Sequence, residues 1–247
     1  MKIAILSDIH GNLIALETIL NHIKKNECDK IFFLGDYVLA GAQPKETISL
    51  IMKLFKQDNV EMIQGNTDKM ISDFSEEILE VVKNGAPIMA NALVDDISIL
   101  SEEEKTFLKN LPENKLVEVD GIKLLLTHGS PRKNNENIFP DTPLATVEEM
   151  VTDTDASIIV CGHTHIPCGF QTNTKKTVIN VGSVGRPFTE DTKCCYLILD
   201  INNGEVEIEH KLVRYDKEKS AEILSKRNFD GADKLSQILI NPENRHM

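Results

Sequence analysis

Side chains that bind metals well occur at five places in this chain, each directly after a short apolar stretch that predicts a β-strand. The seven residues are Asp8, His10, Asp36, Asn66, His128, His163 and His165. In layered α/β proteins, ligands bind at the carboxyl ends of strands, so we expect these five places to meet at one edge of the sheets. Glycines beside them permit tight turns and close approach of the backbone. The pattern therefore predicts one shared site.

The number and type of these donors indicate a chemistry. Two Asp, one Asn and four His are too many for one closed tetrahedral zinc site, but they suit two metal ions about 3.5–4 Å apart. Imidazole and carboxylate without thiolate favour Mn, Fe, Zn or Ni over Ca or Mg, and we take Mn as the first candidate. Two adjacent dications lower the pKa of a bridging water and bind anionic phosphate. The donors predict a hydrolase of phosphate esters.

The first half of the chain alternates strand and helix patterns that would position these residues. Strands are predicted over 2–7, 30–34 and 60–63, and apolar residues recur at helical spacing between them. Pro44 suits the first turn of the second helix. Strand–helix–strand connections of this length imply parallel pairing and an α/β layered fold.

The rest of the chain has a different character. Residues 69–112 lack strand signals and predict two or three helices, with Ser101 as a helix cap. Further strands are predicted over 115–119, 122–126, 157–161, 168–171, 177–180, 194–200 and 205–212. The tail over 216–247 is expected to be helical, with a break at 230–231. Because no segment has the composition of a linker, we expect a single domain over 1–247, with two packed sheets and helices outside.

Composition and charge exclude several classes of partner. The 247 residues include 27 Lys plus Arg and 39 Asp plus Glu, so the formal net charge is −12. This charge disfavours nucleic acid and an anionic membrane surface. The chain has no apolar run long enough to span a membrane and does not begin like a secretory signal. Five cysteines without CxxC spacing indicate free thiols in a reducing compartment, so we expect a cytoplasmic protein.

Taken in order, the five blocks resemble the calcineurin-like metallophosphoesterase superfamily. Its signature runs D-x-H, G-D, G-N, H and G-H-x-H, and all five blocks occur here between Asp8 and His165. The turn Gly182–Pro187, GSVGRP, is similar to the glycine-rich turn of the small bacterial and archaeal phosphodiesterase branch. The resemblance spans about residues 1–210. It implies a four-layer αββα sandwich of two mixed β-sheets flanked by helices.

The resemblance also implies a role for each ligand. One ion would bind Asp8, His10 and His165, the second would bind Asn66, His128 and His163, and Asp36 would bridge both. A hydroxide that bridges the metals would attack phosphorus in line, without a covalent enzyme intermediate. Asp36, Asn66 and His128 would thus be catalytic as well as metal ligands. A small phosphate ester is the implied substrate.

One position departs from the family pattern. Many members carry His after the G-N block as a proposed general acid, and Thr67 stands there in this chain. A Thr hydroxyl is a poor proton donor, so protonation of the leaving group stays open and phosphodiesters are favoured. Phosphomonoesters, phosphoproteins and dinucleoside polyphosphates remain alternatives. Asp68 is expected to act in catalysis by orienting a neighbour, such as a ligand His or Asn66, against the alternative of a solvated Asp.

Several interpretations stay open at this point. Arg132 and Arg186 are candidates for binding the phosphate of the substrate, but each could instead pair with an acid. Residues 69–112 would form a helical cap over the metals or an ordinary surface layer. The helical tail would pack on the core or on a second subunit in a homodimer. A non-catalytic binding scaffold is disfavoured because all seven ligands are present.

Overall fold

The computed structural model of the protein describes residues 1–189 and 191–243 and contains the strands that the sequence predicts. The strands are β1 Lys2–Leu6, β2 Lys30–Phe33, β3 Val60–Met62, β4 Asn114–Val119, β5 Ile122–Thr127, β6 Ile158–Cys161, β7 Cys168–Gln171, β8 Thr177–Asn180, β9 Cys194–Asn202 and β10 Glu205–Val213. The helices are α1 Leu13–Lys25, α2 Pro44–Leu54, α3 Asn66–Ser72, α4 Glu76–Gly85, α5 Pro87–Ile99, α6 Glu102–Asn110, α7 Leu144–Met150, α8 Lys217–Ser225 and α9 Ala232–Ile240.

The strands form two mixed five-stranded sheets. The first has the order β10-β9-β1-β2-β3, with β1, β2 and β3 parallel and β9 and β10 antiparallel to their neighbours. The second has the order β4-β5-β6-β8-β7, in which β5, β6 and β8 are parallel. Because β1 is paired on both edges and buried on both faces, Ile3–Leu6 can be continuously apolar.

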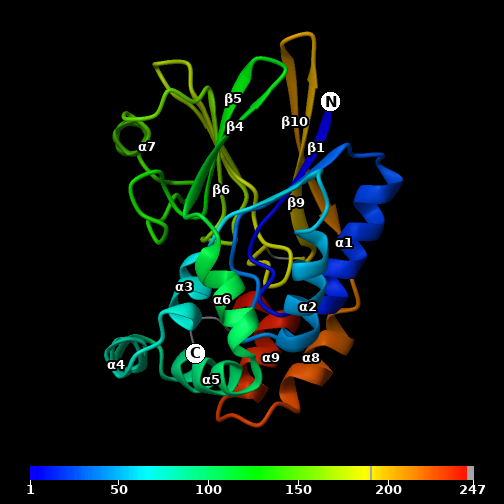
Figure 1. Cartoon of the computed structure of the whole chain (residues 1–247), viewed down its shortest axis with the longest axis vertical. Helices are drawn as coiled ribbons and strands as arrows, with labels where there is room; N and C mark the ends of the chain where they lie inside the picture. Colours follow the sequence, from blue (N-terminus) through cyan, green and yellow to red (C-terminus); the bar gives the residue numbers. More distant parts are fainter. Residues whose placement is uncertain (190, 244–247) are drawn as a thin grey trace.

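The two sheets pack face to face, with helices on both outer faces (Figure 1). Side chains such as Ile5 and Leu34 from one sheet meet Leu126 and Val160 from the other in a core between the sheets. A second core joins α1 and α2 to the outer face of the first sheet, and a third joins α7 to the outer face of the second. This arrangement is the expected four-layer αββα sandwich.

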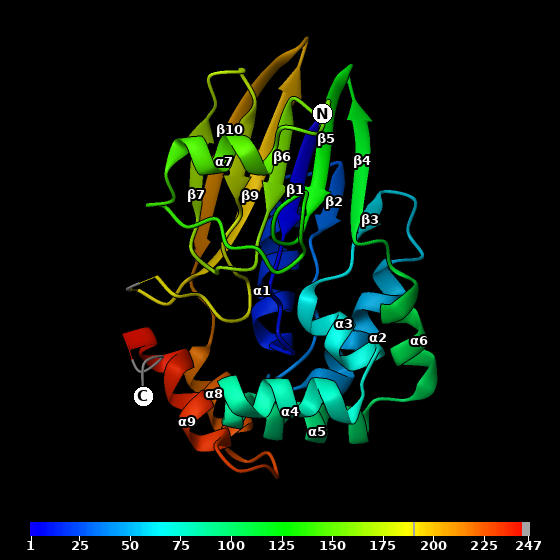
Figure 2. The same ribbon diagram turned by 90° about the vertical axis from the view of Figure 1, so that its left-hand side faces the viewer.

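The remaining helices gather beyond the carboxyl ends of β1 and β2, at the lower end of the molecule in Figures 1 and 2. The middle segment over 69–112 forms α4, α5 and α6, which agrees with the expected two or three helices. Helix α3 begins before this segment, at Asn66. Ser101 caps α6 as expected: its Oγ accepts a hydrogen bond from Glu104 N, and the Glu104 carboxylate accepts one from Ser101 N.

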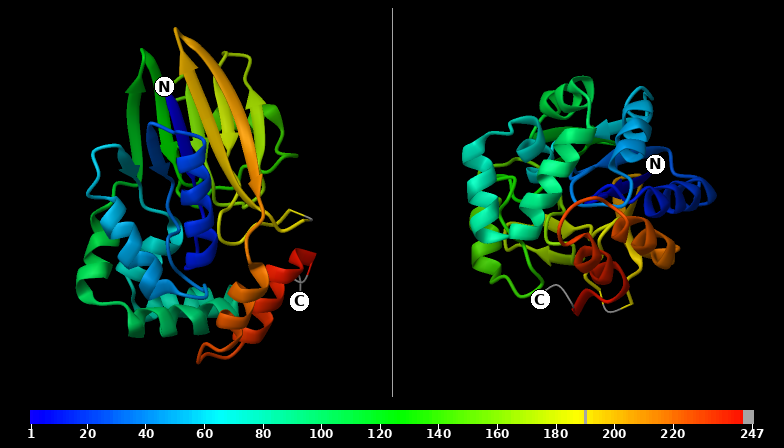
Figure 3. Two further views of the ribbon diagram at one scale, coloured as in Figure 1. Left: turned by 90° about the vertical axis from the view of Figure 1, so that its right-hand side faces the viewer. Right: turned by 90° about the horizontal axis from the view of Figure 1, so that it is seen from below.

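The tail packs on this chain's own core. Helices α8 and α9 are separated by a break at Gly231 and lie against each other, and α8 contacts α1 (Figure 3). Residues 244–247 of the predicted tail lie outside the described residues. No helix in the described part of the chain has both the length and the apolar character needed to cross a membrane.

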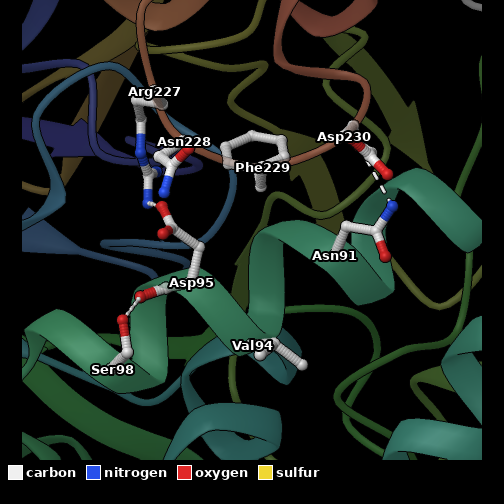
Figure 4. Close-up of a pocket in the computed structure, with 8 residues that line it drawn as sticks. All are labelled: Asn91, Val94, Asp95, Ser98, Arg227, Asn228, Phe229 and Asp230. Carbon is white, nitrogen blue, oxygen red and sulfur yellow. Dashed lines mark hydrogen bonds and ion pairs between the residues drawn. The ribbon is translucent and has the colours of Figure 1, made fainter.

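Arg227 holds the segment between α8 and α9 against α5 (Figure 4). Its guanidinium donates to Gly41 O at 2.8 Å, to Asp96 Oδ1 at 2.6 Å and to the carboxylate of Asp95. The guanidinium also lies over the ring of Phe229, 5.1 Å from its centroid. Asp96 is fully buried, so its charge depends on this partner.

We predict that Arg227→Met lowers the free energy of unfolding by about 3–5 kcal/mol, because it leaves the buried Asp96 carboxylate without a cation. Lys226→Met is the matched control. Within residues 1–189 and 191–243, Lys226 pairs with Glu222 alone, at the surface, and its side chain is 69% exposed, so this change should stay within about 0.5 kcal/mol. Urea denaturation of both variants checks the difference. Equal stabilities would contradict the structural role of Arg227.

Candidate metal centre

The candidate ligands lie in tight turns with unusual backbone geometry. Asp8, His10, Asp36, His163 and His165 all have positive φ, between 46° and 68°. For residues with a side chain, this left-handed conformation costs on the order of 1–2 kcal/mol each. Such strain persists only where the surrounding structure imposes it, and it clusters at functional sites. The strand-end turns therefore present these side chains at an energetic cost.

The turns bring two carboxylates against three imidazoles. Asp8 Oδ1 lies 3.3 Å from His165 Nε2, 3.8 Å from His10 Nε2 and 3.9 Å from His128 Nε2. Asp36 Oδ2 lies 3.4 Å from His128 Nε2 and 3.7 Å from His10 Nε2. Two overlapping groups could each hold a metal ion, and both are buried: Asp8, His10 and His165, and Asp8, Asp36 and His128.

Backbone carbonyls fix the tautomer of these three imidazoles. The Nδ1 atoms of His10, His128 and His165 lie 3.2, 2.7 and 2.7 Å from the carbonyl oxygens of Leu39, Leu34 and Arg186. A carbonyl can only accept, so Nδ1 must carry the proton and each Nε2 of a neutral ring must be an acceptor. Second partners of this kind orient histidine ligands in metal sites.

This geometry fits a bound cation. The Nε2 atoms of His10 and His165 lie 3.1 Å apart, so in the neutral tautomers two lone pairs face each other. Asp8 Oδ1 is buried and has no hydrogen-bond partner among the described residues. A divalent ion would satisfy both nitrogens and this oxygen. Nitrogen and oxygen donors without thiolate suit a transition metal of the Mn, Fe, Zn or Ni type.

The buried groups also shift each other's pKa. Burial opposes ionisation of Asp8, but His165 and His128 outweigh it and lower the pKa of Asp8 to about 2. Burial likewise opposes the charge of Asp36, whose pKa is nevertheless lowered because His128 and His10 lie beside it. Burial and the nearby Arg186 lower the pKa of His10 to about 3. Both carboxylates are therefore charged and His10 is neutral at pH 7, as cation binding requires.

His128 supplies a positive charge next to these two carboxylates. Burial disfavours its imidazolium, but Asp36 and Asp8 raise its pKa to about 10. The Oδ1 atom of Asn66 lies 3.0 Å from its Nε2, and the ring of His163 packs against it with centroids 5.2 Å apart. His163 N donates to Asp8 Oδ2 at 2.9 Å. The structure thus brings all seven sequence-predicted ligands into one cluster.

Asp68 is buried rather than solvated, and it contacts the backbone of a neighbouring turn. Its fully buried carboxylate accepts hydrogen bonds from the backbone N–H groups of Asp36, Tyr37 and Gly65, at 2.7, 2.9 and 2.9 Å. It therefore orients the backbone of the turn that carries Asp36, rather than the side chain of Asn66 or a ligand His. Burial and the charge of Asp36 raise the pKa of Asp68 to about 7.

The two candidate arginines have different environments. Arg132 is exposed, and its Nε and Nη2 donate to the carboxylate of Glu136 at 3.1 and 2.6 Å. The structure thus shows the second of the two interpretations left open for Arg132, an ion pair with an acid, while its contact with a phosphate stays a prediction. Arg186 is only 8% exposed, and its Nη2 donates to Ala40 O at 2.6 Å. Among the described residues Arg186 forms no ion pair with a carboxylate; its Nη1 lies 3.7 Å from Met89 Sδ, and its charge helps to lower the pKa of His10.

Sequence reasoning missed the residues that hold these turns in place. Asn180 is fully buried, donates to Gly162 O at 2.6 Å and to Thr164 Oγ1 at 2.9 Å, and so fixes the turn of His163 and His165. Asp96 accepts from Ala40 N at 2.8 Å. These contacts cross 16 and 56 residues of chain, and no local sequence signal marks them.

Gly162 allows the backbone to approach the candidate ligands. A Cβ at this position would lie 2.0 Å from Ser7 Oγ and 2.6 Å from Asp8 Oδ2, well inside van der Waals contact. A side chain here would therefore displace the Asp8 carboxylate, which lies within 4 Å of three imidazoles.

We predict that Gly162→Ala weakens Mn²⁺ binding at least tenfold, because metal sites tolerate little displacement of a ligand. Gly169→Ala on β7 is the control, since a Cβ there meets only Val178 O at an ordinary 3.9 Å. Titration calorimetry with Mn²⁺ measures both affinities. Wild-type affinity for Mn²⁺ in the Gly162→Ala variant would show that the close approach of the backbone at Gly162 is not needed for metal binding.

The comparisons with known proteins agree with this geometry. Residues 1–204 match the family model of the calcineurin-like phosphoesterase superfamily domain. The chain is 32% identical to an uncharacterized protein of Methanocaldococcus jannaschii over 243 residues, which cover 92% of this chain and 93% of that one.

Two solved structures share the fold over nearly the whole chain. A hypothetical protein from Pyrococcus horikoshii superposes with a TM-score of 0.84 at 22% identity, covering 96% of this chain and 97% of that one. A metallophosphoesterase from Sphaerobacter thermophilus superposes with a TM-score of 0.76 at 24% identity, covering 98% and 99%. With the family match over 1–204, these findings establish that the chain is a hydrolase that belongs to the calcineurin-like phosphoesterase superfamily.

Proposed function

We propose that this protein hydrolyses small phosphodiesters with two divalent metal ions, of which Mn²⁺ is the first candidate. Asp8, His10 and His165 would hold one ion, Asn66, His128 and His163 the second, and Asp36 would contact both. The single observation that carries the proposal is the pair of imidazole Nε2 atoms 3.1 Å apart, each fixed as an acceptor by a backbone carbonyl. The five free cysteines, three of them buried, support a reducing cytoplasm.

When bound, the ions would supply positive charge for the phosphoryl oxygens and lower the pKa of water. In the overall reaction, a water oxygen forms a bond to phosphorus, the bond from phosphorus to one alcohol oxygen breaks, and the alcohol leaves with a proton. The protein's own residues would orient the phosphate. Arg186 is the residue placed best for this task, because its guanidinium is charged, buried and without a carboxylate partner among the described residues.

The position of Thr67 supports diesters over monoesters. Its Oγ1 is buried and has no hydrogen-bond partner among the described residues, and its N–H donates to Asp36 Oδ1 at 2.9 Å. Thr67 therefore helps to orient Asp36 and offers no group with a pKa suited to protonating a leaving alcohol. The site therefore suits an ester whose leaving group departs without receiving a proton from a protein side chain.

We predict that protein stripped of metal by a chelator has no phosphoesterase activity and regains it when Mn²⁺ is added. With bis(4-nitrophenyl) phosphate and 4-nitrophenyl phosphate side by side, kcat/KM should be at least tenfold higher for the diester. Asp36→Asn, which reduces the negative charge of the site, should lower kcat at least a hundredfold. Preference for the monoester would overturn the substrate class, and normal turnover by the Asp36 variant would overturn the role of Asp36.

We predict that Arg186→Met raises KM or lowers kcat for the diester so that kcat/KM falls by about 100-fold, in line with a lost charged hydrogen bond to phosphate. Arg132→Met is the matched control, since Arg132 is exposed and paired with Glu136, and it should change kcat/KM by less than about threefold. Steady-state kinetics on both variants compare the two residues. Equal losses would contradict the assignment of phosphate binding to Arg186.

A further inference from the structure

A pocket of about 570 Å³ opens beside Asn66, a volume typical of small-molecule sites. Its walls come from α3, α4 and the loop after β5, and include Asn66, Met70, Ile78, Val81, Val82 and Asn134. The pocket adjoins the metal centre, because Asn66 Oδ1 lies 3.0 Å from His128 Nε2. Figure 2 shows α3 and α4 on the side that faces the viewer.

The wall formed by α4 is apolar and incompletely covered. Ile78, Val81 and Val82 follow helical spacing and lie on one face of this helix. No residue of α4 is fully buried, and Val81 is 72% exposed, more than any other large apolar side chain in the described part of the chain. An exposed apolar face beside a polar site is typical of a ligand-binding groove.

The charges of the pocket exclude an anionic occupant. Lys69 is the basic residue of the lining, and it is engaged by Asp73 at 3.3 Å and Glu113 at 3.1 Å. Glu77 also lines the pocket. A second phosphate or a polyphosphate chain would find no unpaired cation in this lining, and would meet carboxylates instead. The occupant is therefore not an anion, and the apolar wall of Ile78, Val81 and Val82 suits a neutral group better than a hydrated cation.

One wall offers an unused hydrogen-bond donor. Asn134 follows His128 along the chain, in the loop after β5, and its Nδ2 is buried without an acceptor among the described residues. A buried amide N–H group that lacks an acceptor costs free energy. A neutral oxygen or nitrogen acceptor on the occupant could satisfy it after a small shift of this side chain.

We propose that this pocket binds the alcohol group of the substrate ester, and that this group is uncharged, largely apolar and at least the size of an aromatic ring. The inference rests on the proposed function, because it places the ester phosphate at the adjoining metal centre. Arg186 lies beside His10 and His165, whereas the pocket opens beside Asn66 and His128. The phosphate would thus lie between a cationic side and an apolar side.

Phosphonates test the pocket without turnover, because their P–C bond is not hydrolysed. We would titrate the full chain, loaded with Mn²⁺, with methylphosphonate, phenylphosphonate and 4-carboxyphenylphosphonate in a calorimeter. Phenylphosphonate should bind at least tenfold more tightly than methylphosphonate, and the additional carboxylate should remove this advantage. Equal affinity for methyl- and phenylphosphonate, or no binding of either, would overturn the proposal.

Val81→Glu is the diagnostic variant, because an exposed side chain can be replaced without disturbing the core. It should abolish the preference for phenylphosphonate and leave the affinity for methylphosphonate within about twofold. Val94→Glu, the same change at a 48% exposed position of α5 outside this pocket, should keep the preference. If both variants behave alike, the pocket is not the binding site of the ring.

This test separates the pocket from the proposed function. A tenfold preference for phenylphosphonate that Val81→Glu abolishes would establish the pocket even if no ester were hydrolysed. Metal-dependent hydrolysis of esters with no preference between the two phosphonates would keep the proposed function and overturn the pocket.

Discussion

Two carboxylates, Asp8 and Asp36, lie buried at the ends of neighbouring strands, and burying a charge is costly unless partners compensate it. The compensation comes from the imidazolium of His128, whose Nε2 lies 3.4 Å from Asp36 Oδ2 and 3.9 Å from Asp8 Oδ1, and from the backbone N–H groups of His163 and Thr67. Both aspartates have positive φ, and Gly162 lets the backbone approach the Asp8 carboxylate closely. Because a divalent cation would relieve the remaining charge, the same arrangement that strains the backbone also creates affinity for metal.

The turns around the carboxylates are held by parts of the chain that carry no ligand. The loop after Asp36 presents Leu39 O to His10, Ala40 O to Arg186 and Gly41 O to Arg227. Asp96 of α5 accepts the N–H of Ala40 and pairs with Arg227, which precedes α9. The tail lies outside the residues 1–204 that match the family model, yet through this loop it helps to orient a candidate metal ligand and the candidate phosphate-binding arginine.

The site has two chemically different sides. Arg186 contributes a buried positive charge next to the turn of His165, whose Nδ1 donates to its carbonyl. On the Asn66 side, α4 contributes aliphatic side chains, and the one lysine of the lining is paired with acids. In the proposed arrangement α4 would form a wall of the substrate pocket beside the metals. The role of the segment over 69–112 as a cap stays a prediction, and the part of it that lines this pocket runs from Lys69 to Val82.

The sequence by itself determined the layers and the types of ligand. Apolar stretches separated by turns such as Asp120-Gly121 are sufficient to predict the ten strands, because alternation and turn chemistry are local. Metal-binding residues at strand ends predicted a common site, since parallel strands end at one edge of a sheet. The tertiary structure decided which polar residues take part. Arg132 and Arg186 both lie in turns rich in Gly, Ser and Pro, yet one pairs with Glu136 at the surface and the other is buried and donates to Ala40 O. Burial and Coulomb energy depend on distance across the fold, and partners such as Asp96 and Arg227 come from segments 131 residues apart. A local sequence pattern contains no information about such distances. The roles of these residues can therefore be assigned only from the folded chain.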